Sequence, residues 1–152
     1  MITGVAFAPD NRTALSVSAD GQLRTWSIAA PEFALNLAGH ASQIYGIAFS
    51  PDGNRLASAS NDKTVKVWDL AMGKEIKALA AQGAAVYSVA FSPDGTQLLT
   101  GGGDKTVRLF DAAGGGEIRQ FAGAEGAVYS VAFHPQATLV AAAGVDKKIR
   151  LW

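Results

Sequence analysis

Short apolar stretches alternate with turns rich in Pro, Asp and Gly, and residues 43–84 show the pattern clearly. The apolar stretch 44–49 is followed by the turn 51–54, in which Pro presets φ and Gly accepts a positive φ. Three further stretches favour strand, at 55–60, 65–68 and 76–80, and residues 61–64 form a tight polar turn. Turn signals return about every ten residues, which leaves no room for long helices. We therefore expect four short strands in an antiparallel meander.

The predicted strands lack the alternation of apolar and polar residues that is typical of a sheet with one face in water. Residues 56–60 and 86–91 are apolar or small at nearly every position. A sheet that buries both faces must lie between two similar sheets, and repetition of this arrangement around an axis gives a β-propeller. We therefore expect an all-β fold of propeller blades, each a four-stranded antiparallel meander with a crowded innermost strand.

The whole pattern repeats with a step of 42 residues, so a repeat architecture is expected. An aromatic residue recurs at that step, at Trp26, Trp68, Phe110 and Trp152. Proline, aspartate and tyrosine keep the same step, at Pro9, Pro51, Pro93 and Pro135, at Asp20, Asp62, Asp104 and Asp146, and at Tyr45, Tyr87 and Tyr129. We expect one unit over residues 1–152, with blades at about 1–42, 43–84, 85–126 and 127–152.

Composition narrows the classes of function. Hydrophobic residues make up 49% of the chain and charged residues 17%, so the chain can bury a core. The 13 basic and 13 acidic residues balance, which argues against a dedicated nucleic-acid binder. No apolar run predicts a membrane span and the first residues do not resemble a signal peptide, so we expect no membrane partner and a cytoplasmic location. With no cysteine and two histidines, we expect no metal site and no cofactor.

The chain resembles the WD-repeat β-propeller family over its whole length. The matching residues are "GH" at 39–40, "SPDG" at 50–53, the turn aspartate followed by Lys or Gly, and "WD" at 68–69. The resemblance implies a buried structural hydrogen-bond network of His40, Ser58, Asp62 and Trp68. The first three could also be read as a hydrolase triad, but geometry and not composition defines a triad. We therefore expect no catalytic residues and no enzyme activity.

The other repeats depart from this pattern. Gln82 and Ala124 stand where the second repeat has His40, Phe110 replaces the indole, and Ala142 lacks a hydroxyl. We expect the complete network in the second blade alone.

The resemblance also places three tyrosines at the mouth of the central channel, a surface on which partners of this family dock. They are Tyr45, Tyr87 and Tyr129, and the residues expected to rim the same opening are Asn61, Lys63, Lys105 and Lys147. Tyrosine is favoured at interfaces because it offers apolar area and a hydroxyl together. Packing of the rings between blades is an equally good interpretation for the tyrosines, and a solvated rim is the simpler one for each lysine.

Three functions follow from these features. The first is a non-catalytic interaction scaffold that binds a peptide or protein at the channel mouth. The second is an enzyme with its active site in the channel, which is disfavoured because the innermost strands hold Gly, Ser, Ala and Val there. The third is a half-propeller building block whose only activity is self-assembly.

The strand count favours assembly with a second molecule. The repeats supply four, four, four and three strands, and we expect four blades to be too few for a closed ring. Apolar residues on the outer faces of the first and last blades would then be exposed, namely Val5, Phe7, Val131, Phe133, Ile149 and Leu151. We expect a two-fold homodimer that forms one eight-bladed ring, the alternative being a different chain that carries the missing blades.

Overall fold

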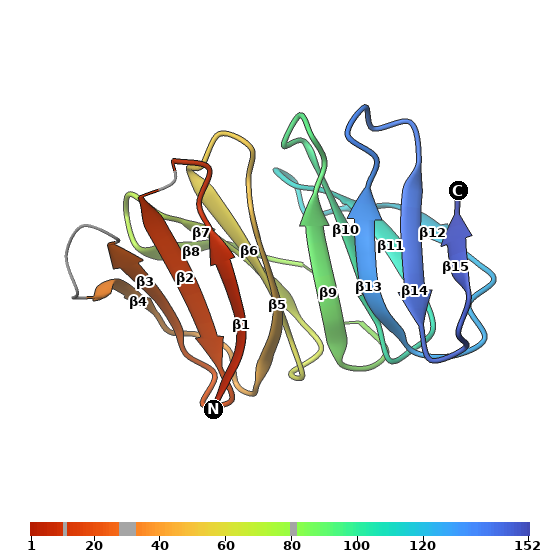
Figure 1. The fold of residues 1–152 in the computed structure, drawn as a ribbon, viewed down its shortest axis with the longest axis horizontal. Coiled ribbons are helices and arrows are strands. Elements are labelled where there is room, and N and C mark those ends of the chain that lie inside the picture. Colours follow the sequence, from red (N-terminus) through yellow and green to blue (C-terminus); the bar gives the residue numbers. More distant parts are fainter. Residues whose placement is uncertain (11, 28–32, 80–81) are drawn as a thin grey trace.

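The described residues, which are 1–10, 12–27, 33–79 and 82–152 of a computed structural model, form four antiparallel sheets and no helix (Figure 1). Blade 1 comprises β1 (Ile2–Phe7), β2 (Thr13–Ser18), β3 (Leu23–Ser27) and β4 (Phe33–Leu37), and blade 2 comprises β5 (Ile44–Phe49), β6 (Arg55–Ser60), β7 (Val65–Asp69) and β8 (Lys74–Ala78). Blade 3 comprises β9 (Val86–Phe91), β10 (Gln97–Gly102), β11 (Val107–Asp111) and β12 (Glu117–Phe121), and blade 4 comprises β13 (Val128–Phe133), β14 (Val140–Gly144) and β15 (Ile149–Leu151).

In every blade each strand pairs with the next strand in the sequence, so the blades are meanders. The sheets stand side by side with β1, β5, β9 and β13 as neighbouring inner strands (Figure 1). This arrangement confirms the expected all-β propeller fold. The described part of the chain contains no helix of the length and apolarity needed to cross a membrane.

The strands of blade 2 lie close to the predicted ranges, with one shift. The outermost strand was expected at 76–80, but β8 covers Lys74–Ala78, and residue 80 lies outside the described residues. Lys74 and Glu75 extend the strand because they pair with Asp69 and Trp68 of β7. A polar start is tolerated because the outermost strand is an edge, where charged side chains also discourage pairing with other molecules.

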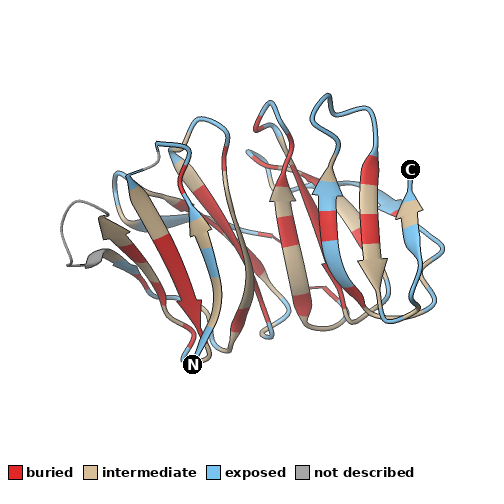
Figure 2. Cartoon of the chain, in the orientation of Figure 1, coloured by how far each residue is buried: buried red, intermediate tan, exposed pale blue. Residues whose placement is uncertain are grey.

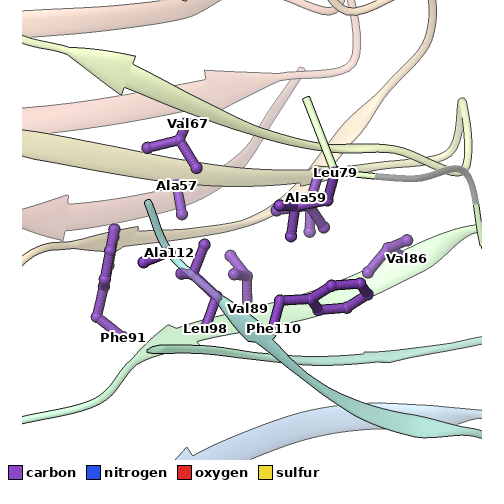
Figure 3. Close-up of a cluster of buried hydrophobic side chains, with 11 residues drawn as sticks. Ala57, Ala59, Val67, Leu79, Val86, Val89, Phe91, Leu98, Phe110 and Ala112 are labelled. Carbon is purple, nitrogen blue, oxygen red and sulfur yellow. The ribbon is translucent and has the colours of Figure 1, made fainter. Parts of the chain in front are cut away.

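Buried residues gather on the middle strands of the sheets (Figure 2), and each buried hydrophobic cluster draws its side chains from two neighbouring blades. The second strands β2, β6 and β10 are the most deeply buried parts of their sheets. We call the face of a blade toward the next blade its leading face and the face toward the previous blade its trailing face. Figure 3 shows one such contact: the leading face of blade 2, with Ala57 and Val67, meets the trailing face of blade 3, with Val89, Phe91 and Leu98.

The contact recurs between the other neighbouring blades. Leu15, Val17 and Leu23 of blade 1 share a buried cluster with Ile44, Leu56 and Trp68 of blade 2. Leu99 and Val107 of blade 3 share another with Val128, Val131, Val140 and Ala142 of blade 4. The expectation that Val131 and Phe133 are exposed on the outer face of the last blade is therefore wrong, because both pack against blade 3. Because full burial of a Val or Leu side chain contributes about 1.5–3 kcal/mol, each blade is stabilised chiefly through its neighbours.

The inner strands approach too closely for side chains at some positions. A Cβ on Gly46 of β5 would lie 2.8 Å from the carbonyl oxygen of Tyr87 and 3.2 Å from the Cα of Ser88, both on β9. These neighbours are backbone atoms, which cannot move aside without shifting the strand. We therefore expect Gly46→Ala to lower the free energy of unfolding by about 1–3 kcal/mol.

Gly116→Ala is the matched control, because no atom lies within 4 Å of a Cβ at that position. We expect it to change the free energy of unfolding by less than about 0.5 kcal/mol. Urea denaturation measures both variants, and equal effects would contradict the close approach of β5 and β9.

Candidate functional site

Three side chains of blade 2 and one from the loop that precedes it are linked by a continuous series of hydrogen bonds. Trp68 Nε1 donates to Ser58 Oγ (2.8 Å), and Ser58 Oγ lies 2.7 Å from His40 Nε2. His40 Nδ1 lies 2.8 Å from Asp62 Oδ2. Because a carboxylate can only accept, we assign the ring proton to Nδ1 and let Ser58 donate to Nε2. The series connects β7, β6, the loop after β4 and the turn between β6 and β7.

The ionisation states follow from burial and hydrogen bonding. Burial lowers the pKa of His40 below its usual value of 6.5, although the bond with Asp62 acts in the opposite direction. Burial would raise the pKa of Asp62, but hydrogen bonds from Thr64, His40 and the backbone N–H of Ala41 lower it to about 2. At neutral pH the ring is therefore neutral and the carboxylate is charged.

The geometry of Ser58 does not suit a nucleophile. Its side chain is fully buried, and its oxygen is already engaged by both Trp68 and His40. A substrate carbonyl would have to reach this oxygen through the packed interior of blade 2. The arrangement is instead suited to fixing the turn and the loop above it.

In the third repeat the position equivalent to His40 is Gln82, whose side chain makes different contacts. Gln82 Oε1 accepts from Thr100 Oγ1 (3.3 Å) and from Arg108 Nη1 (3.2 Å). Gln82 Nε2 is buried and has no hydrogen-bond partner among the described residues. Arg108 also donates to Asp104 (2.7 Å). The turn aspartate of this blade is thus held by an arginine instead of an imidazole.

The same substitution occurs in blade 4, where Arg150 and the backbone N–H of Glu125 donate to Asp146. In blade 2 the equivalent residue is Lys66, and it pairs with Glu75 instead of the turn aspartate. The sequence shows a basic residue at this position in every repeat but did not reveal its role. One feature of the sequence could have indicated this role: the two repeats that lack the histidine have arginine at this position, Arg108 and Arg150, whereas the repeat with His40 has lysine.

The tyrosines expected at the channel mouth occupy β-bulges. In β5 the pairing register shifts between Ile44 and Gly46, so Tyr45 is the extra residue of the strand. Tyr87 and Tyr129 sit at the same shift in β9 and β13. A bulge re-aims the side chain of its extra residue. Sequence reasoning missed the bulges, because period-two patterns do not show an extra residue of this kind.

The three rings form one row across the inner strands. The centroids of Tyr45 and Tyr87 are 5.2 Å apart, and those of Tyr87 and Tyr129 are also 5.2 Å apart, with tilted or edge-on planes. Tyr129 is 58% exposed, and the other two rings are partly buried. The rings therefore pack between blades and at the same time present an aromatic surface.

The residues expected at the rim lie in the turns between the second and third strands. Lys63, Lys105 and Lys147 are exposed and have positive φ angles of 72°, 65° and 62°. In the described residues none of the three forms an ion pair. Asn61 is exposed, and its amide donates to Ser42 Oγ (3.1 Å). Across the described ranges, no three His, Cys, Asp or Glu side chains converge into a metal-binding group.

The difference between His40 and Gln82 predicts different costs of truncation. His40→Ala removes a donor to the partly buried carboxylate of Asp62, so we expect it to lower the free energy of unfolding by about 3 kcal/mol. Gln82→Ala leaves Asp104 bonded to Arg108 and removes an unsatisfied amide, so we expect a loss of about 1 kcal/mol. Thermal and urea unfolding measure both, and equal shifts would contradict the structural role of the network.

The network also predicts a pH dependence. Both His40 and Asp62 have folded-state pKa values below their unfolded values, so the unfolded chain binds more protons on acidification. The stability from His40 is complete above about pH 6.5 and falls as the solution is acidified below it. The stability from Asp62 is complete above about pH 4 and is lost as the pH falls through its folded-state pKa, which is about 2.

Urea denaturation over this range measures the effect. We expect His40→Ala to flatten the slope of stability between about pH 7 and pH 5, where a perturbed histidine titrates. An unchanged slope in that variant would assign the pH dependence to other groups.

Comparison with protein families agrees with this geometry. The family model described as "WD domain, G-beta repeat" matches residues 1–27, 32–69, 73–111 and 115–152. No curated protein matches the chain. The second matched segment runs from β4 of blade 1 through β7 of blade 2, and the later segments show the same offset. One sequence repeat thus joins two blades. With nearly its full length matched in four segments, the chain belongs to the WD-domain, G-beta-repeat family.

Proposed function

We propose that the chain binds a peptide or protein at the channel mouth, which we define as Tyr45, Tyr87, Tyr129, Asn61, Lys63, Lys105 and Lys147. Membership of the WD-repeat family makes it a domain of the protein-interaction scaffold kind. The single observation that carries the finer proposal is the row of three tyrosines held on bulges. A bulge at the same place in successive inner strands keeps these rings together at one end of the blades.

The tyrosine row has the chemistry of a peptide-binding surface. Its rings offer apolar area, and their hydroxyl groups can bond to a peptide backbone. Tyr45 already donates to Gln43 Oε1 (3.0 Å), which fixes the direction of its ring. Because the rings are also packed on one another, little side-chain entropy is lost when a partner binds.

The lysines give the rim a positive charge. The aspartates beside them are already engaged: Asp62 by His40 and Thr64, and Asp104 by Arg108. The lysines themselves occupy left-handed backbone conformations, where Gly21 stands in the first repeat with φ 77°. A non-glycine residue held in such a conformation can indicate a functional requirement for its side chain. These features favour a partner segment that carries carboxylates.

Peptides selected from a random displayed library on the purified chain provide the test. We expect the selected peptides to be acidic, and we expect Tyr129→Ala to weaken their binding about tenfold, or ~1.4 kcal/mol. We expect Lys105→Gly to weaken binding as well while raising the free energy of unfolding, since glycine relieves the positive φ. Calorimetric titration and urea denaturation measure the two effects.

Lys74→Ala is the matched control, because Lys74 is an exposed lysine on the outermost strand of blade 2. It should leave peptide affinity unchanged. Peptides that bind Tyr129→Ala and Lys105→Gly as tightly as the wild type would contradict binding at the channel mouth.

A second candidate function, self-assembly into a ring, is supported by the outer faces of the terminal blades. Val5 and Phe7 on the trailing face of blade 1 are 72% and 70% exposed, whereas their equivalents in blade 3, Val89 and Phe91, are buried. Ile149 on the leading face of blade 4 is 78% exposed, whereas its equivalents in the other blades are fully buried. The exposed trailing face of blade 1 and the exposed leading face of blade 4 are therefore equivalent to the faces that pack together between neighbouring blades.

A second copy of the chain is the occupant that these faces fit best. The leading face of blade 4 has an apolar hollow of about 330 Å³ lined by Ala132, Leu139, Ala141 and Leu151. Phe7 of a second copy would enter it as Phe91 enters the contact between blades 2 and 3. Two such head-to-tail contacts join two copies into a ring of eight blades, which lies within the range of known propellers.

Light scattering on the 152-residue chain tests this assembly. We expect a mass near twice 15.7 kDa for the wild type. Phe7→Asp places a charge in the contact and should give a mass near 15.7 kDa. Ile76→Asp is the control, because Ile76 is an exposed apolar residue on the outermost strand β8, away from both faces. A wild-type monomer at micromolar concentration would overturn the ring.

A further inference from the structure

The grooves between neighbouring blades differ at the end of the sheets opposite the tyrosines. Tyr45 lies at the beginning of β5, whereas Phe49 ends β5 and is followed by the turn that contains Gly53. At this end a groove of about 470 Å³ lies between the leading face of blade 1 and the trailing face of blade 2. The described residues that line it include Asp10, Thr13, Leu35, Phe49, Gly53 and Leu70. The volume is typical of a ligand-binding pocket.

The equivalent position between blades 2 and 3 is occupied by a side chain of the protein itself. Arg55 Nη2 donates to the carbonyl oxygen of Gly95 (2.9 Å), and Arg55 Cζ lies 5.5 Å from the centroid of the Phe91 ring. A guanidinium over an aromatic ring gains a cation–π attraction in addition to its hydrogen bonds. These two contacts show that a groove between neighbouring blades can hold a guanidinium group.

A shift by one repeat of 42 residues converts the occupied groove into the open one. Phe49 is equivalent to Phe91 and Gly53 is equivalent to Gly95, so the aromatic ring and the backbone carbonyl are both present in the groove between blades 1 and 2. Thr13 occupies the position equivalent to Arg55, so this groove lacks the guanidinium. In the described part of the chain the carbonyl of Gly53 receives no side-chain donor.

The remaining groove, between blades 3 and 4, also contains a cation. Arg119 of β12 lines it, with Cζ 4.9 Å from the centroid of the Phe121 ring. One repeat earlier the same position is Lys77, and in blade 1 it is Leu35. Among the described residues, blade 1 is thus alone in sending no basic side chain from its leading face into the groove that follows it.

The open groove carries a negative group and an apolar border. Asp10 lines it, and its carboxylate accepts hydrogen bonds from the backbone N–H groups of Arg12 and Thr13. The side chain of Arg12 is exposed, and the ion pairs of the described residues do not include it. Leu35 and Leu70 border the groove and can contact apolar side chains next to a bound arginine.

We propose that the groove between blades 1 and 2 binds the guanidinium of an arginine side chain that belongs to a partner polypeptide. The guanidinium donates to the carbonyl of Gly53, lies over the ring of Phe49 and faces the carboxylate of Asp10. The groove is larger than one guanidinium, and its leucines accommodate an apolar neighbour of the arginine, which selects a polypeptide over free arginine. Lysine is a poor substitute because an ammonium group lacks the planar fork that both stacks and donates.

The test is an NMR titration of the full chain with the capped pentapeptide Gly-Leu-Arg-Leu-Gly. We expect saturable shifts at the amides of Phe49 and Gly53, one peptide per chain, and no saturable shifts with the peptide in which lysine replaces arginine. Thr13→Arg supplies the chain's own guanidinium and should abolish binding. Arg55→Thr opens the equivalent groove between blades 2 and 3 and should raise the stoichiometry to two peptides per chain.

Several outcomes would overturn the proposal: undiminished binding to Thr13→Arg, unchanged stoichiometry in a folded Arg55→Thr, or equal binding of the lysine peptide. Free arginine that binds as tightly as the peptide would overturn the assignment to a partner polypeptide. The amide spectrum of each variant reports whether it is folded, and should one variant not fold, the other decides together with the peptide comparison. Tyr129→Ala should leave this binding unchanged, which keeps the result separate from that of the channel mouth.

Discussion

Contact between the apolar faces of neighbouring sheets is the constraint on which the rest of this structure depends. The blades have apolar residues on both faces, so a single blade in water would leave these faces exposed. The buried clusters accordingly draw their members from two blades each, as Ala57 and Leu98 do between blades 2 and 3. Each blade therefore needs a neighbouring blade to bury its apolar faces.

The contacts of the polar residues around this core differ from repeat to repeat. The turn aspartate is held by His40 in blade 2, by Arg108 in blade 3 and by Arg150 in blade 4. In each of these blades donors bind the carboxylate, but in blade 2 the hydrogen bonds also connect β6 and β7 through Ser58 and Trp68. Thr13 occupies the position equivalent to Arg55. Arg55 fills the groove between blades 2 and 3, whereas Thr13 has no guanidinium and leaves the groove between blades 1 and 2 open. Repeats within one chain thus serve as internal references for each other.

Much of the fold was predictable from the sequence, because strands, turns and their order depend on local pattern. The turn 51–54 and the strands of the second repeat lie at or near their expected places. The start of β8 was not predictable, because its first residues, Lys74 and Glu75, pair with β7 through an irregular register. The bulges at the tyrosines, the role of Arg108 and the open groove were missed for a similar reason. Each depends on which atoms meet across strands or blades, and a single repeat does not contain that information.

The central claim, that each blade is stabilised by its neighbours, is tested most directly by native-state hydrogen exchange on Leu99→Ala. Leu99 is fully buried on the leading face of blade 3, where it packs with Val131 and Val140 of blade 4. Truncation of such a residue costs about 2–5 kcal/mol. The account predicts that protection falls in both β9–β12 and β13–β15, with the smallest change in β1–β4, which share no buried cluster with blade 3 in the described residues. Loss of protection confined to blade 3 would show that the blades are stable independently and would contradict the account.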